Sequence, residues 1–134
     1  MTRETKETIC PGCNHKQERR IRKDSTRVNH FCNTCKQDKL FSAFRQAKYK
    51  FPQLNFNDYK KLKSINNCEI CNVKLTDGGG PGTSGATNRQ IDHCHETNVI
   101  RGVLCWNCNS AIGKLGDTAA LVMRAVDYLK QKES

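Results

Sequence analysis

Residues 91–113 read IDHCHETNVIRGVLCWNCNSAIG, and this stretch decides how the second half of the chain folds. It opens with an Asp-His-Cys-His cluster, continues through a short segment typical of a hairpin, and ends in a Cys-x-x-Cys knuckle that Asn109 follows directly. The knuckle supplies thiolates that suit structural zinc, whereas Asp92, His93 and Asn109 suit a harder catalytic ion. The stretch therefore combines two kinds of metal chemistry.

The composition predicts a small intracellular protein that is stabilised by bound metal. With 134 residues, of which 36% are hydrophobic and 7% aromatic, the chain can form only a thin core. Such cores usually need additional cross-links such as disulfides or bound metal, and nine cysteines are available to provide them. We find no apolar run long enough for a membrane span and no secretory signal pattern. We therefore expect a reducing, cytoplasmic setting, where Cys-x-x-Cys pairs more often bind metal than form disulfides.

The positive charge is concentrated in the first half of the chain. The formal net charge is +10; residues 1–64 hold 16 Lys and Arg against 6 Asp and Glu, whereas residues 65–134 hold 7 of each. This asymmetry favours a polyanionic partner, most simply nucleic acid. The alternative is a basic, solvated surface without a partner.

Two sets of four cysteines have spacings typical of zinc sites. The first set has the pattern C-x2-C-x18-C-x2-C, and the second has C-x2-C-x33-C-x2-C. Four thiolates complete a tetrahedral structural zinc site, so we expect two zinc ions, and His15 becomes a surface residue rather than a ligand. Disulfides are the minor alternative. The first set is Cys10, Cys13, Cys32 and Cys35, and the second is Cys68, Cys71, Cys105 and Cys108.

Basic residues lie between the two knuckles of the first set. A basic hairpin on a zinc ribbon would contact phosphates without reading bases, although a merely soluble loop explains the same composition. We expect residues 1–8 to be frayed and a short strand around Val28, His30 and Phe31. The predicted DNA contacts in this segment are Arg19, Arg20, Arg22, Lys23 and Arg27.

The remaining apolar spacing predicts two helices and a domain boundary. Leu40, Phe41 and Phe44 are expected to close over the first zinc site, and residues 46–54 are expected to form a linker. Helices are predicted over residues 58–65, capped by Asn57, and from a cap at Asp117 to about residue 132. The apolar stripe of the last helix fits either core packing or a dimer interface. We expect a basic zinc-ribbon domain over residues 1–54 and a second domain over residues 55–134.

The second domain resembles the recombination endonuclease VII family, phage-type nucleases of the His-Me finger (HNH-like) group. The signature is Asp92-His93-x-His95, then Val99-x-Arg101-Gly102-x-Leu104-Cys105-x-x-Cys108-Asn109 and Gly113. The first knuckle and the last helix also fit, so the resemblance covers about residues 55–132. Cys94 departs from the pattern, because the best-known members have an aspartate there.

The resemblance implies a small α+β, zinc-stabilised fold with a ββα-metal (His-Me finger) nuclease core. By analogy His93 is the general base, His95 assists it, and Asp92 and Asn109 hold one Mg²⁺ or Mn²⁺ ion. Arg101 is the predicted DNA contact of this domain. The implied substrate is branched DNA such as a Holliday junction, cut in the phage-infected host cell, and paired cuts favour a homodimer.

Alternation along a strand sets a condition on this site. Asp92 and His93 point to opposite faces of a regular strand, so both can reach one phosphate only if the strand ends or bulges there. The structural alternative to a catalytic role is that both histidines are core residues or part of the zinc shell. Two rival functions remain open at this stage: a nuclease without structural preference that nicks or cuts ordinary duplex DNA, and a non-catalytic zinc protein that binds nucleic acid as a regulator.

Overall fold

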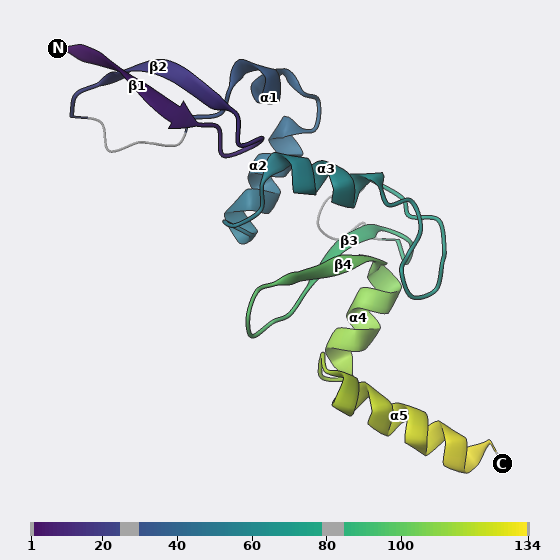
Figure 1. Cartoon of the computed structure of the whole chain (residues 1–134). Coiled ribbons are helices and arrows are strands. Elements are labelled where there is room, and N and C mark those ends of the chain that lie inside the picture. The colour runs from purple at the N-terminus through teal and green to yellow at the C-terminus, as the bar shows by residue number, and fades with distance from the viewer. Residues whose placement is uncertain (1, 25–29, 79–84, 134) are drawn as a thin grey trace. The chain divides into compact units, whose positions relative to one another are not determined.

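A computed structural model of the chain describes residues 2–24, 30–78 and 85–133, and Figure 1 shows its elements in order. The chain divides into two compact units, Met1–Lys63 and Ser64–Ser134. Both units combine helices with a two-stranded antiparallel sheet, which confirms a small α+β protein. Arg27 and Val28 lie outside the described residues, as does part of the glycine-rich segment at residues 79–84.

The first unit opens with a hairpin. Strand β1 (Arg3–Ile9) pairs antiparallel with β2 (Lys16–Arg22), and the Cys10–Cys13 knuckle lies in the turn between them. The prediction of a frayed amino terminus is therefore wrong, because β2 supplies the backbone partners of residues 3–9. The predicted strand at His30 and Phe31 is also wrong, since neither residue belongs to a strand.

An aromatic cluster forms the core of the first unit. It joins the segment before helix α1 (Asn33–Gln37) to helices α2 (Phe41–Lys50) and α3 (Phe56–Ser64). The rings of Phe44 and Phe56 stack with centroids 4.8 Å apart, and both side chains are fully buried. The other rings of the cluster are Phe31, Phe41 and Tyr59.

Helix α3 packs with the first unit, because its Phe56 belongs to the aromatic cluster, and the two compact units divide after Lys63. The predicted linker is wrong over its first part, since α2 continues to Lys50. Beyond it, Phe51 is buried, and the Lys48 ammonium donates to the carbonyl oxygens of Pro52 and Leu54 at 2.8 and 3.0 Å.

The cap of α3 also differs from the prediction. The Asn55 side chain accepts a hydrogen bond from the backbone N–H of Asp58 at 2.8 Å, so the helix begins at Phe56 and Asn57 lies within it. Both asparagines are competent caps. The helix begins earlier because the buried Phe56 ring has to face the cluster.

The second unit follows the order strand, strand, helix, helix. Strands β3 (Arg89–His93) and β4 (Ile100–Cys105) pair antiparallel, helix α4 (Trp106–Lys114) leaves the end of β4, and α5 (Ala119–Lys132) follows it (Figure 1). The α5 helix has no fully buried residue, and Met123, Tyr128 and Leu129 are at least half exposed on it. No helix in the described part of the chain is both long and apolar enough to cross a membrane.

The first knuckle of the second unit is fastened to β4. The Glu69 backbone N–H donates to the carbonyl of Val103 at 3.2 Å, and the Glu69 carboxylate accepts from the Val103 N–H. A Cβ atom at Gly102 would lie 2.2 Å from the Glu69 carboxylate oxygen. Glycine at this position therefore leaves room for the Glu69 carboxylate beside the strand.

Candidate active site and metal centres

Each predicted set of four cysteines comes together in space. Within each set the four sulfur atoms lie within 4.8 Å of one another, and all nine cysteines are free. Three sulfur pairs, Cys10–Cys35, Cys13–Cys32 and Cys71–Cys105, are each 3.8 Å apart. A tetrahedral zinc with sulfur at about 2.3 Å has sulfur–sulfur edges of about 3.8 Å, so the sulfur geometry fits zinc. Both clusters could bind a zinc ion.

Backbone N–H groups around the sulfurs favour thiolates. Cys10 Sγ accepts from the N–H groups of Gly12 and Cys32 at 3.4 and 3.3 Å. Burial alone raises the pKa of the Cys10 thiol, but these and neighbouring bonds lower it to about 6. Burial likewise raises the pKa of Cys68, yet hydrogen bonds from the backbone N–H groups of Cys105, Cys71 and Ile70 bring it to about 6. Each cluster thus holds one thiol that ionises readily, as metal ligation requires.

The pKa values of Cys35 and Cys108 reflect the crowding of sulfur atoms in each cluster. Burial and the surrounding cysteines raise the pKa of Cys108 to about 12, and the same causes raise the pKa of Cys35 further. Four thiolates in one small volume repel one another, and a divalent cation offsets that repulsion. The donor set and its electrostatics therefore both fit zinc.

A bulge in the β3–β4 hairpin lies at the Asp-His pair. Asp92 is opposite Gly102 and His93 is opposite Ile100, so Arg101 is the extra residue of β4. A bulge of this kind redirects side chains that regular alternation would send to one face. The bulge therefore belongs to β4, and β3 itself ends at His93.

The bulged Arg101 binds the Asp92 carboxylate. Its Nε and Nη2 atoms donate to the two oxygens of Asp92 at 2.7 and 2.8 Å, which is a bidentate pair. Asp92 is buried, with 8% of its surface exposed. The residue predicted to hold a metal ion and the residue predicted to contact DNA are thus bound to each other.

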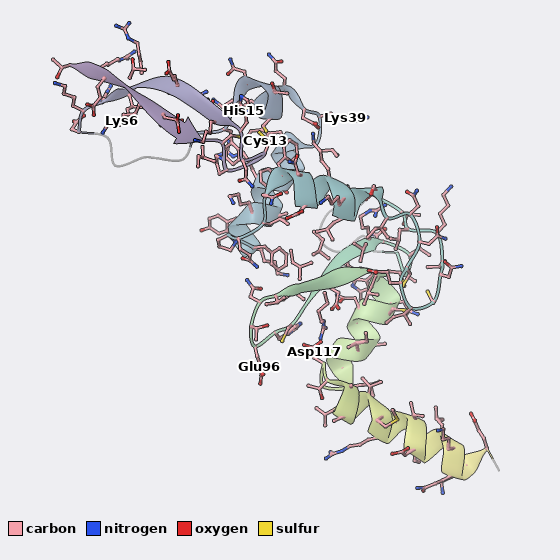
Figure 2. The ribbon with its side chains drawn as sticks, in the orientation of Figure 1. Lys6, Cys13, His15, Lys39, Glu96 and Asp117 are labelled. Atoms are coloured by element: carbon pink, nitrogen blue, oxygen red, sulfur yellow. The ribbon has the colours of Figure 1, made fainter. Side chains whose placement is uncertain are left out.

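Asp117 is the second partner of Arg101 and was not among the predicted site residues. Its carboxylate accepts from Arg101 Nη2 at 2.5 Å and from the His95 backbone N–H at 3.3 Å. The Arg101 guanidinium holds the pKa of Asp117 below its usual range. Figure 2 labels Asp117 in the turn between α4 and α5, beside the β3–β4 hairpin.

The backbone explains why Asp117 is not the helix cap. Asp117 has a φ of +64°, and the next residue, Thr118, caps α5 by accepting from the Leu121 N–H at 3.3 Å. The prediction of Asp117 as the cap is therefore wrong by one residue. The sequence feature that could have pointed to Asp117 as a site residue is its carboxylate next to Gly116. Gly116 has a φ of +104°, which favours glycine.

The two predicted catalytic histidines contact each other. The rings of His93 and His95 stack with centroids 4.9 Å apart and an interplanar angle of 8°. His93 is half-buried and His95 is exposed. Among the described residues both metal clusters consist of cysteine alone, so neither histidine belongs to a zinc shell.

Asn109 lies in the first turn of α4, next to a zinc-cluster cysteine. The N–H of Cys108 donates to Cys105 Sγ at 3.4 Å, which fixes the start of the helix. The Asn109 side chain is half-buried and has no hydrogen-bond partner among the residues that the structure describes. Its amide oxygen is therefore available to a ligand.

A pocket of about 480 Å³ lies beside the Asp92 carboxylate. Asp92, Arg101 and Asp117 form its polar part, and side chains of α4 and α5 form a larger apolar part. His93, His95 and Asn109 do not line it. The structure thus groups the predicted residues as Asp92 with Arg101 and His93 with His95, while Asn109 stands in neither group.

The predicted DNA contacts of the first unit lie on or after β2. Arg20, Arg22 and Lys23 are exposed. Arg19 is half-buried, and its guanidinium donates to the Phe31 carbonyl at 3.1 Å. Arg19 therefore has a side-chain contact that Arg20, Arg22 and Lys23 do not make with any residue the structure describes.

Comparison with known proteins gives one family. The profile described as recombination endonuclease VII matches residues 42–131, which include α3, β3, β4 and α4 in full and all but one residue each of α2 and α5. The Gene 59 protein of Mycobacterium phage D29 is 43% identical over 42 residues, which cover 31% of this chain and 26% of that protein. The chain thus spans about a quarter of the length of that curated relative. No solved structure matches the chain significantly.

Proposed function

Because the chain belongs to the recombination endonuclease VII family, we propose that it is a metal-dependent DNA endonuclease that cuts branched DNA such as Holliday junctions. The observation that carries this proposal is the family match, which spans the Asp92–Asn109 segment. The β3–β4–α4 order and the bulge at Asp92 and His93 support a ββα-metal core.

The proposed site of the catalytic ion comprises Asp92 and Asn109. A carboxylate and an amide supply the hard oxygen ligands that Mg²⁺ and Mn²⁺ prefer, with waters and substrate phosphate in the other positions. Pairing with Arg101 leaves Asp92 able to bind an ion, because a carboxylate has about four lone-pair sites and Arg101 uses two of them. When bound, the ion would neutralise charge that develops on the phosphate.

His93 is the proposed general base. A water attacks phosphorus, its proton passes to the His93 imidazole, and the bond from phosphorus to the leaving sugar oxygen breaks. A positioned base of this kind typically contributes about 10²–10⁴ in rate. His95, stacked on His93 at 4.9 Å, would fix the orientation of that ring.

The other proposed parts hold the protein and its substrate in place. Two structural zinc ions would bind the cysteine clusters, and the basic hairpin of the first unit would contact the DNA backbone. Paired cuts in a symmetric junction need two active sites, which supports a homodimer. The exposed apolar residues of α5 are the surface that such a dimer would cover.

The test is cleavage of a labelled four-way junction beside a linear duplex of matched sequence, with Mg²⁺ and with Mn²⁺. The proteins compared are the wild type, His93→Ala, and His15→Ala as a matched control, since His15 is exposed in the first unit. We expect selective junction cutting that His93→Ala loses and His15→Ala retains.

Other outcomes separate the rival functions. Equal cutting of junction and duplex would keep the nuclease and discard the preference for branched DNA. Cutting by His93→Ala at the wild-type rate would remove His93 as the base. Binding without any cutting would favour a zinc protein that regulates rather than hydrolyses nucleic acid.

A further inference from the structure

Three arginines gather at one end of the β1–β2 hairpin. Arg3 is directly opposite Arg22 in the register, and Arg20 lies two residues before Arg22 on the same face. Together with Ile21 and His30 they line a pocket of about 340 Å³, which we name the arginine pocket. Only Arg20 and Arg22 of this group were predicted as DNA contacts.

No described carboxylate balances the charges in the arginine pocket. Elsewhere on the hairpin, Lys6 pairs with Glu4 at 2.6 Å and Lys16 pairs with Glu7 at 3.1 Å. None of the three pocket arginines forms an ion pair with a carboxylate within residues 2–24, 30–78 and 85–133. Like charges directly across an antiparallel pair destabilise it. The arrangement is therefore one that an anion would stabilise.

His30 supplies a second and independent sign of a ligand. Its Nε2 atom is buried and has no hydrogen-bond partner among the described residues. Buried polar atoms are nearly always paired, so an orphan that lines a basic pocket indicates a missing partner.

The segment that carries His30 is held in place by β2. The Gln17 side-chain amide donates to the His30 carbonyl at 2.6 Å, and the Arg19 guanidinium donates to the Phe31 carbonyl at 3.1 Å. These bonds hold the backbone of His30 and Phe31 against β2, and the His30 side chain lines the same pocket as the arginines. Arg19 thus positions the pocket rather than contributing its charge to it.

We propose that the arginine pocket binds one phosphate group of the DNA that the protein acts on. Guanidinium groups match phosphate oxygens in a planar, bidentate fashion, and an imidazole N–H can donate a further bond. The pocket lies in the half of the chain that carries the whole positive surplus. The choice of DNA rests on the proposed function, whereas the phosphate chemistry follows from the pocket.

The first test compares two charge-matched double variants of the full, zinc-loaded chain. Arg20→Gln with Arg22→Gln removes two charges from the pocket. Lys36→Gln with Lys39→Gln removes two charges from exposed positions of the same unit that lie outside the hairpin and do not line the pocket. Affinity for duplex DNA is measured at several salt concentrations without any divalent ion, so that cleavage does not interfere.

We expect the pocket variant to bind several-fold more weakly, with a salt slope of log K smaller by about 0.9, the value for one lost phosphate contact. The control variant should keep the wild-type slope. Equal slopes for the two variants would overturn the proposal, because charge alone would then explain binding.

The second test needs no variant and titrates inorganic phosphate into the wild type while imidazole resonances are followed by NMR. We expect the His30 resonances to shift and saturate while those of exposed His15 stay in place. Parallel drifts of His30 and His15 would overturn the proposal. Duplexes with 5′-hydroxyl and 5′-phosphate ends then identify the source: equal affinity supports a backbone phosphodiester, and tighter binding of the phosphorylated end supports a terminal phosphate.

These readouts are independent of catalysis. If the chain cuts no DNA but the pocket variant loses affinity and slope, the nuclease proposal fails and the pocket stands. If the chain cuts junctions but the two double variants bind alike, the pocket fails and the nuclease stands.

Discussion

Replacing Arg101 with glutamine should destabilise the second unit, because the Asp92 and Asp117 carboxylates lose their cationic partner. Arg101 donates two hydrogen bonds to Asp92, one to the Asp117 carboxylate and one to the Asp117 carbonyl. The side chains of Asp92 and Asp117 are 11% and 16% exposed, whereas that of Arg101 is 34% exposed. The variant therefore leaves two largely buried carboxylates facing each other without their cation.

The size of the effect follows from these exposures. Removing one partner of a fully buried pair costs about 3–5 kcal/mol, and the one-third exposure of Arg101 reduces this through solvent screening. We therefore expect a loss of about 2–3 kcal/mol in the free energy of unfolding. For a small unit this corresponds to a fall in Tm of roughly 8–24 °C.

The assay is thermal unfolding followed by circular dichroism at neutral pH with zinc in excess. Arg124→Gln on α5 is the matched control, because Arg124 is exposed, and its Tm should stay within about 2 °C of the wild type. A Tm for Arg101→Gln that equals the control value would refute the reasoning.

The pH dependence of this stabilisation has a definite sign. Arg101 lowers the pKa of Asp117 in the folded state, so the contribution is present above the unfolded value of about 3.9 and is lost as pH falls through the folded value. The difference between wild type and Arg101→Gln should therefore be constant from about pH 6 to pH 8. A steady change across that range would assign the effect to another group.

The same variant should change metal affinity in the opposite direction. The guanidinium and a divalent ion compete for the negative charge of Asp92, so its removal should tighten Mn²⁺ binding while it lowers stability. Calorimetric titration of Mn²⁺ into both zinc-loaded proteins measures this. Weaker Mn²⁺ binding by Arg101→Gln would mean that Arg101 orients Asp92 for the ion instead.

The other predictions concern the metal centres and the packing. Metal analysis should find two zinc ions per chain. A strong chelator should abolish the folded circular dichroism spectrum, because each structural zinc supplies apparent binding energy of about 10–16 kcal/mol. One zinc ion per chain would contradict the prediction that both cysteine clusters bind zinc. Gly102→Ala should cost about 1–3 kcal/mol in urea unfolding, since its Cβ would lie 2.2 Å from Glu69, whereas Gly113→Ala, with nothing within 4 Å, should be neutral or slightly stabilising. Phe44→Ala should cost about 3–5 kcal/mol in the same assay, because Phe44 is fully buried against Phe56, and a loss below about 1 kcal/mol would exclude it from the core.

Helix starts show where local sequence information ends. Asn55 and Asn57 are both good caps, and so are Asp117 and Thr118, so sequence rules alone do not choose within either pair. In α3 the buried Phe56 is the first helical residue, so Asn55 is the cap. In the turn before α5, Arg101 draws Asp117 into the site and leaves Thr118 as the cap.

The sequence by itself determined the two cysteine clusters, the family and the small α+β class. These depend on short spacings, because a Cys-x-x-Cys turn brings two sulfurs together wherever it lies, and the Asp-His-x-His and Cys-Asn signature is contiguous. Tertiary structure alone decided which side chains meet. Arg101 reaches both Asp92 and Asp117 only because of the bulge and the turn after α4, and His30 reaches Arg3 and Arg22 only because β2 holds its segment. Such contacts join residues far apart in the chain, so the pairing register and the turns fix them, not the residue pattern.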